Sequence, residues 1–232
     1  MKPRRHHRLY LVASVAFVAL VFVAFARKFY LAWLFHSPAL SVLLLIHGAV
    51  MSGWVILLVG QSALIAAGRT KLHRRVGVFG TVWAGLVVIL GSVATLHASA
   101  REVREGTPMA PLQLTITGLE LVQMAAFLCL VAAAIWLRNR GDFHKRLMLL
   151  TIACMLPSIF PRLPFDAFTS FTAILVGTYV YLAICIGLDT LQHRRLHPAF
   201  AWGGALFVVA LQLTLLGART PAWQHFLARA VS

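Results

Sequence analysis

Seven long apolar stretches follow one another along the chain and are separated by short polar segments. They cover residues 9–26, 39–67, 76–96, 112–137, 147–160, 168–188 and 199–217. An α-helix needs about 20 mostly apolar residues to cross the hydrocarbon core of a bilayer, which is about 30 Å thick. The pattern therefore predicts an all-α protein, a polytopic transmembrane bundle of about seven helices. Because these stretches use most of the chain, we expect one integral membrane domain over residues 1–232.

Two of the stretches depart from a simple membrane span. The fifth is short, and Pro157 and Pro161 interrupt its end, which indicates either a broken or a re-entrant helix. The first follows a basic N-terminus and so resembles a signal peptide. Its 18 apolar residues exceed the roughly 7–15 of a signal-peptide core, and we expect it to be retained as the first helix.

Composition agrees with lipid as the solvent. Hydrophobic residues make up 60% of the chain and charged residues only 12%, whereas a soluble domain has about 45–50% and about 25%. The formal net charge of +15 comes from basic residues in the segments between spans. Anionic lipid headgroups are the expected counter-charge. We therefore expect the lipid bilayer as partner and no nucleic acid.

The distribution of basic residues predicts an orientation. Fourteen of the 21 Lys and Arg residues lie in the N-terminal segment and in the segments after the second, fourth and sixth spans. Since basic residues are enriched in cytoplasmic loops, the N-terminus is expected in the cytoplasm and the C-terminus in the periplasm of a bacterial inner membrane.

A basic histidine motif recurs between the apolar stretches. It reads LHRRVG at residues 72–77 and FHKRLM at 143–148, with weaker copies at 6–9 and 193–198. In the predicted orientation every copy lies on the cytoplasmic side, at the start of an outward-going helix. The recurrence suggests repeated helix hairpins of duplicated origin, although the enrichment of basic residues in cytoplasmic loops alone would also produce it.

The histidine motifs admit three interpretations. In the first, the motif residues lie at the membrane surface and bind lipid phosphates; these residues are His73, Arg74, Arg75, His144, Lys145 and Arg146. In the second, histidines from two helices ligate a haem b iron from both sides. In the third, His193 and His197 bind a catalytic metal in a membrane hydrolase, because their spacing of four suits one helix face. Pro198 argues against the third interpretation.

Haem ligation has two candidate histidine pairs. His73 with His144 would serve near the cytoplasmic face, and His47 with His97 near the opposite face. The second pair is less well matched in depth, since His97 lies about 10 Å shallower than His47 along its helix.

Ionisable and polar groups within the spans predict a second site. Such groups are costly in the hydrocarbon core, and they usually face the bundle interior or a cavity. We expect an outer-side polar cavity lined by six residues, His47, His97, Glu120, Gln123, Arg162 and Gln212. The alternative is a set of separate helix–helix hydrogen bonds. Glu120 is expected to pair with Arg162; without a partner it would be neutral and able to relay protons beside His47.

One face of the second span carries an unusual stripe. His47, Met51, Trp54, Leu58 and Gln61 recur at helical spacing. Because the stripe includes Trp54 and Gln61, we expect it to face the bundle interior, where it either lines a ligand pocket or packs.

These motifs resemble a family of bacterial proteins. The pattern is His47-Gly48, Trp54 and Gln61, then HRR-x-G at 73–77 and FHKRLM at 143–148. It is similar to uncharacterised bacterial multi-pass inner-membrane proteins that carry a domain of unknown function. The resemblance implies an inner-membrane location and supplies no reaction. A looser likeness to b-type cytochrome bundles rests on the histidines near helix ends.

Several function classes are excluded by missing motifs. No Walker motif, HExxH, GxSxG or CxxCH occurs, which argues against nucleotide-driven transport and covalently bound haem. We expect a protein that binds a small hydrophobic or redox ligand, haem b or quinone, within the bundle. The alternative is a structural or assembly subunit without a ligand, acting as an oligomer or with a partner in a membrane complex; a transporter or hydrolase is a lesser alternative.

Overall fold

The computed structural model describes residues 4–218 and 220–231, and this part of the chain is helical without strands. The first half consists of α1 (Arg4–Phe25) with the π-helical turn η1 (Ala26–Tyr30), α2 (Val42–Ala66), α3 (Thr70–Glu105) and α4 (Ala110–Trp136). The second half consists of α5 (Gly141–Ala153), α6 (Leu156–Ile159), the short helices η2 (Phe160–Arg162) and η3 (Asp166–Phe168), α7 (Phe171–His193), α8 (Pro198–Gly217) and α9 (Pro221–Val231).

Seven helical segments are long and apolar enough to cross a membrane. The fold is the predicted all-α polytopic bundle, and the chain is a multi-pass membrane protein. Helices dominate because backbone N–H and C=O groups find no water in the hydrocarbon core and must bond within their own segment.

The third helix is longer than its apolar stretch. It has 36 residues, from Thr70 to Glu105, which is about 54 Å and exceeds the bilayer core. The polar residues of the first basic histidine motif form its first turns, because neither Pro nor a turn residue separates them from the apolar run. The helix ends at Gly106, whose positive φ of 60° suits a residue without a Cβ.

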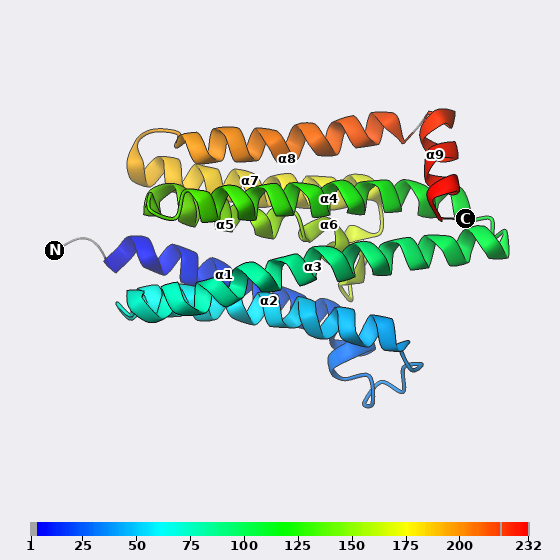
Figure 1. Ribbon diagram of the computed structural model, residues 1–232, viewed down its shortest axis with the longest axis horizontal. Helices are drawn as coiled ribbons and strands as arrows, with labels where there is room; N and C mark the ends of the chain where they lie inside the picture. Colours follow the sequence, from blue (N-terminus) through cyan, green and yellow to red (C-terminus); the bar gives the residue numbers. More distant parts are fainter. Residues whose placement is uncertain (1–3, 219, 232) are drawn as a thin grey trace.

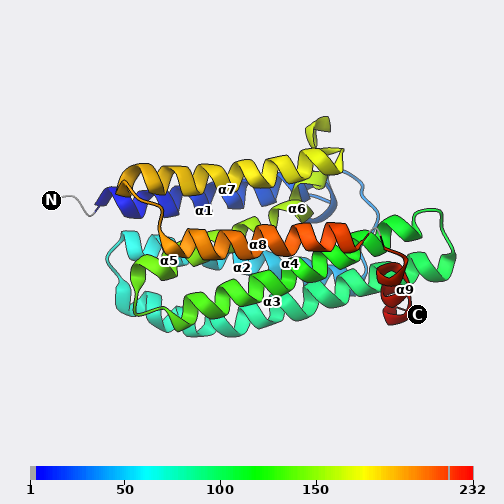
Figure 2. The ribbon, with the colours of Figure 1, turned by 90° about the horizontal axis from the view of Figure 1, so that it is seen from above.

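The fifth span is a broken helix that crosses the bundle. α5 ends at Ala153, and α6 begins at Leu156 with Pro157 in its first turn. A proline has no N–H for the carbonyl four residues earlier, so the helix breaks here. α5 starts at one end of the bundle and η3 lies near the start of α7, toward the other end (Figure 2).

The long helices lie roughly side by side along one axis of the molecule (Figure 1). In Figure 1, α1, α2 and α3 form one side and α8 the other, and α8 packs on α4 and α5, which lie between them. α7 packs on α5 and α6. The turns α2–α3, α4–α5 and α7–α8 share one end, at the left of Figure 1, which we call the basic end. α9 lies across the opposite end and packs against α3 and α4.

The core is centred on α4 and α5. Phe127 and Leu130 of α4 pack in one buried cluster with Leu150 of α5 and Phe207 of α8. Glycine allows the closest approach: a Cβ on Gly203 of α8 would lie 2.6 Å from Leu150. Small residues at helix crossings give the tight packing on which helix association in lipid depends.

Candidate functional site

The two full copies of the basic histidine motif meet at the basic end. His73 and His144 are each the fourth residue of a helix, α3 and α5, and each helix follows a turn that ends in arginine, Arg69 or Arg140. The two imidazole rings lie with centroids 6.1 Å apart and planes at 81°. Two residues separated by 71 positions in the chain thus form one pair.

The His144 ring is oriented by the end of α4. Its Nδ1 lies 2.8 Å from the carbonyl oxygen of Ala134, in the last turn of α4, where carbonyls lack helical partners. A carbonyl only accepts, so Nδ1 of His144 donates, and in a neutral ring the Nε2 lone pair is free. A histidine held in this way by its second nitrogen is in the usual state of a metal ligand.

The His73 ring is held by Gln61 of α2. With its amide turned so that both ends meet complementary groups, Gln61 donates from its nitrogen to Nδ1 and to the carbonyl oxygen of His73, and its oxygen accepts from the backbone N–H of Gly77. This amide orientation leaves the proton of a neutral His73 on Nε2. The reverse orientation would set the amide oxygen against an Nδ1–H and leave the Nε2 lone pair to a metal.

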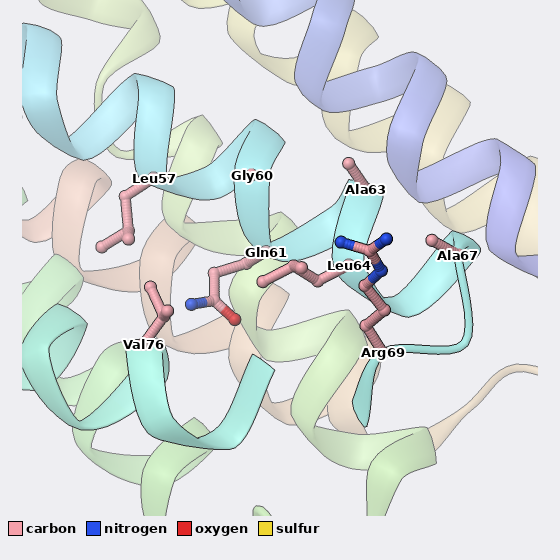
Figure 3. Close-up of a pocket in the computed structure, with 8 residues that line it drawn as sticks. All are labelled: Leu57, Gly60, Gln61, Ala63, Leu64, Ala67, Arg69 and Val76. Atoms are coloured by element: carbon pink, nitrogen blue, oxygen red, sulfur yellow. The ribbon is translucent and has the colours of Figure 1, made fainter. Parts of the chain in front are cut away.

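An open hollow is lined in part by Gln61 (Figure 3). It has a volume of about 460 Å³ and lies between α2 and α3 at the basic end. Its walls include the apolar side chains of Leu57, Leu64 and Val76, and its polar groups are Gln61 and Arg69. Gln61 therefore contacts both the histidine pair and the hollow.

Arg146 and Asp189 form a buried ion pair beside the histidine pair. Nε and Nη2 of Arg146 each lie 2.8 Å from a carboxylate oxygen of Asp189, and the two side chains are 2% and 1% exposed. Nη1 of Arg146 donates to the carbonyl oxygen of Asp142 at 2.8 Å. The interpretation of Arg146 as a lipid-phosphate anchor is therefore wrong, because its guanidinium points into the bundle. Arg74 and Arg75 are exposed.

The ion pair joins three helices. The Tyr10 hydroxyl of α1 donates to Asp189 at 3.3 Å, and Lys145 lies 5.2 Å from the centre of the Tyr10 ring. His193, on the last turn of α7, has its Nδ1 2.8 Å from the carbonyl oxygen of Asp189. This network connects α1 and α5 to α7 at the basic end.

His193 and His197 contact different acidic residues. Nδ1 of His197 accepts from the backbone N–H of Ala199 at 3.1 Å, so its Nε2 carries the proton and donates to Asp142 at 3.0 Å. His193 instead lies against Asp189. Within residues 4–218 and 220–231, no group of three or more His, Cys, Asp or Glu is arranged to hold a metal ion. Their helical spacing therefore does not place the two histidines on one ligand.

Glu120 is bound by hydroxyl groups from two neighbouring helices. It accepts from Thr95 of α3 at 2.6 Å and from Ser158 of α6 at 3.4 Å. Arg162 donates to the backbone carbonyl of Ser158 and lies 5.5 Å from the centre of the Phe25 ring. The predicted Glu120–Arg162 ion pair is wrong: both residues are described, and the ion pairs between described residues do not include it. The helix break after α5 directs Arg162 back to its own turn.

The other predicted cavity residues divide into two groups. His47 lies within electrostatic range of Glu120 and Arg162, and Gln123 is buried one turn along α4 from Glu120. Gln212 donates instead to the Tyr179 hydroxyl at 2.6 Å, and the side chain of His97 is exposed. The structure thus places His47 within electrostatic range of Glu120 and of Arg162, and it leaves Gln212 and His97 with other surroundings.

The stripe on α2 turns toward other helices. Trp54 is 2% exposed and packs edge to face on Phe127 of α4, with ring centroids 5.1 Å apart. Met51 approaches Gly91 of α3, and Gln61 reaches His73.

The sequence matches no known protein family, no curated protein and no solved structure. The function is therefore inferred from the geometry of the chain's own residues.

Sequence reasoning missed the Arg146–Asp189 pair. Asp189 follows an apolar run and precedes the basic segment at 193–195, and an acidic residue in that place needs a buried cation or water. The position of Asp189 therefore predicts a basic partner at the same end of a neighbouring helix, but the sequence does not identify that partner.

Proposed function

We propose that the protein binds haem b through His73 and His144 in a bacterial inner membrane. The observation that carries this proposal is the ring separation of 6.1 Å. Two metal–nitrogen bonds of about 2.0–2.1 Å, one on each side of an ion, put two imidazole centres on the order of 6 Å apart. The two histidines come from different helices, as a ligand held inside a helical bundle requires. Ligation by His73 requires the Gln61 amide to turn, so that its oxygen accepts from Nδ1–H of His73 and the Nε2 lone pair is free.

Haem suits a two-histidine site better than a bare metal ion does. Structural and catalytic zinc sites use three or four protein ligands, and the described residues offer no cluster of three. A haem iron needs only two axial ligands, because the macrocycle supplies the others. Bound haem would supply one-electron redox chemistry, and the chain would set its potential through the histidines and their burial.

The residues around His73 at the basic end suit a ligand that is mostly apolar and carries carboxylate groups. The hollow beside Gln61 has apolar walls and is lined by Arg69, and Arg74 lies within electrostatic range of His73. Arginine binds carboxylates such as those of haem in a planar, bidentate way. Arg74 and Arg75 are also placed to bind anionic headgroups if the basic end is cytoplasmic.

Visible spectroscopy of the full-length protein tests the proposal. After expression with sufficient haem, the purified protein should show a Soret band that is lost in His73→Ala and in His144→Ala. His97→Ala is the matched control, because this exposed histidine of α3 should leave the band unchanged. A colourless wild-type preparation would refute haem binding, and loss of colour in His97→Ala would move the site to the other predicted histidine pair.

A structural role for the histidine pair is the second candidate. In this role the two rings pack edge to face, and Gln61 donates to Nδ1 of His73. These contacts join α2, α3 and α5 without a ligand. A structural or assembly subunit of this kind would be colourless, and both alanine variants would lower its melting temperature. A quinone bound at the basic end would instead be detected by mass spectrometry of the extracted lipids. The purified protein would then have no Soret band.

A further inference from the structure

Buried polar atoms without a hydrogen-bond partner gather in one part of the bundle. Among the described residues there are eight such side-chain atoms, and seven belong to α2, α3, α4 and α9. Buried polar groups in native proteins are nearly always paired, with protein or with bound water. A concentration of unpaired groups along adjacent helices therefore points to a shared partner.

Four of these atoms lie where α9 covers the ends of α3 and α4. They are Ser99 Oγ, Thr117 Oγ1, Trp223 Nε1 and Gln224 Oε1. The register of the antiparallel helices α3 and α4 places Ser99 level with Thr117, because one turn deeper Thr95 meets Glu120. Both hydroxyl groups are completely buried.

α9 closes this region from outside. The Trp223 indole lies so close to α4 that a Cβ on Gly118 would be 2.8 Å from its Nε1. Gln224 donates from its amide nitrogen to the Thr115 hydroxyl at 3.0 Å, which aligns α9 on α4. Leu227 is buried between the helices. The amphipathic C-terminal helix thus covers the part of α4 that carries Thr117 and Gly118.

Three further unpaired atoms continue the series toward the middle of the bundle. They are Gln123 Oε1, which is 3% exposed, Trp54 Nε1 and His47 Nδ1. The His47 ring also lies against the backbone of Leu90. Gln123 follows Glu120 by three residues on α4, so that the two side chains share a helix face. From Ser99 the polar groups therefore lead to the Glu120 carboxylate and past it.

The chemistry of the unpaired atoms identifies the partner. Indole N–H groups only donate, amide oxygens only accept, and hydroxyls do both. Water can serve all of them in turn, and buried water typically makes about three such bonds. An unpaired hydroxyl is also unusual within a helix of this protein, since Thr178 of α7 bonds to the carbonyl four residues before it at 2.9 Å.

We propose that α3, α4 and α9 enclose a path of bound water along which Glu120 takes up and releases a proton. The step is a simple protonation: a water-borne proton adds to a carboxylate oxygen and leaves by the same route, and no electrons are transferred. Thr95 and Ser158 donate to that carboxylate. Among the described residues, His47 of α2 lies within electrostatic range of Glu120 and also of Arg162 of η2. This proposal does not depend on haem binding.

Infrared spectroscopy of the full-length protein in nanodiscs tests the path. The difference between wild type and Glu120→Gln isolates the C=O stretch of the protonated Glu120 carboxyl. We expect this band to grow as the pH is lowered and to shift when H₂O is replaced by D₂O. Thr117→Val should slow that exchange about tenfold, the effect of losing one hydrogen bond to water.

Thr178→Val is the matched control. It removes an equally buried threonine hydroxyl from a helix outside the path, and it should leave the exchange rate unchanged. Ser99→Ala tests the same point if Thr117→Val does not fold. The proposal is overturned if no Glu120 band titrates, or if Thr117→Val raises the melting temperature without slowing exchange, because the hydroxyl would then lie in a dry, packed interface.

Discussion

The buried pair of Arg146 and Asp189 gives the sharpest test of the fold. Asp189→Asn keeps the shape of the side chain and removes its charge, and Arg146 is then a buried cation without a counter-ion. Removing one member of a buried ion pair typically costs about 3–5 kcal/mol. Because Arg146 keeps its bond to the Asp142 carbonyl, we expect a loss of free energy of unfolding near the lower limit, about 3 kcal/mol.

The double variant Arg146→Met with Asp189→Leu separates charge from packing. Replacing a buried ion pair by apolar side chains of similar size is often neutral or stabilising, since two desolvated charges are removed together. We expect the double variant to unfold within about 1 kcal/mol of wild type, the remaining loss coming from the Tyr10 hydroxyl, whose acceptor disappears.

Equilibrium unfolding of the purified protein in mixed detergent micelles, followed by helical circular dichroism, measures these differences. Arg101→Gln is the control: its pair with Glu102 lies at the end of α3, with the Arg101 side chain 60% exposed, and its removal should not change stability measurably. The reasoning is refuted if Asp189→Asn costs less than about 1 kcal/mol, or if the double variant is no more stable than the single one.

Three further predictions concern topology, packing and the histidine site. A reporter fused after Ser232 should show periplasmic activity, and a cytoplasmic signal would reverse the expected orientation. Gly203→Ala should destabilise the protein by about 1–3 kcal/mol through overpacking against Leu150, while Gly85→Ala, where nothing lies within 4 Å of the added methyl, should be neutral or stabilising in the same unfolding assay. Gln61→Leu should weaken haem retention roughly 10–100-fold by freeing the His73 ring, whereas Gln61→Glu should retain haem; equal haem content in both would show that Gln61 does not orient the ligand.

The sequence by itself determined where the helices lie in the chain and that lipid surrounds them. Each span is a local property, since about 20 apolar residues in a row must form a helix if they are to satisfy their backbone in lipid. The break in the fifth span was equally local, because Pro157 lacks the N–H that the helix needs. His73 and His144 were also recognisable as candidates from one repeated motif.

Tertiary structure alone decided which polar groups meet. Arg75 and Arg146 hold the same place in the two copies of the motif, yet Arg75 is exposed and Arg146 is buried against Asp189. In the same way Glu120 lies against hydroxyl groups and not against Arg162. The physical reason is that partner choice depends on the rotation and depth of each helix against its neighbours, and these follow from packing between segments that are far apart in the chain.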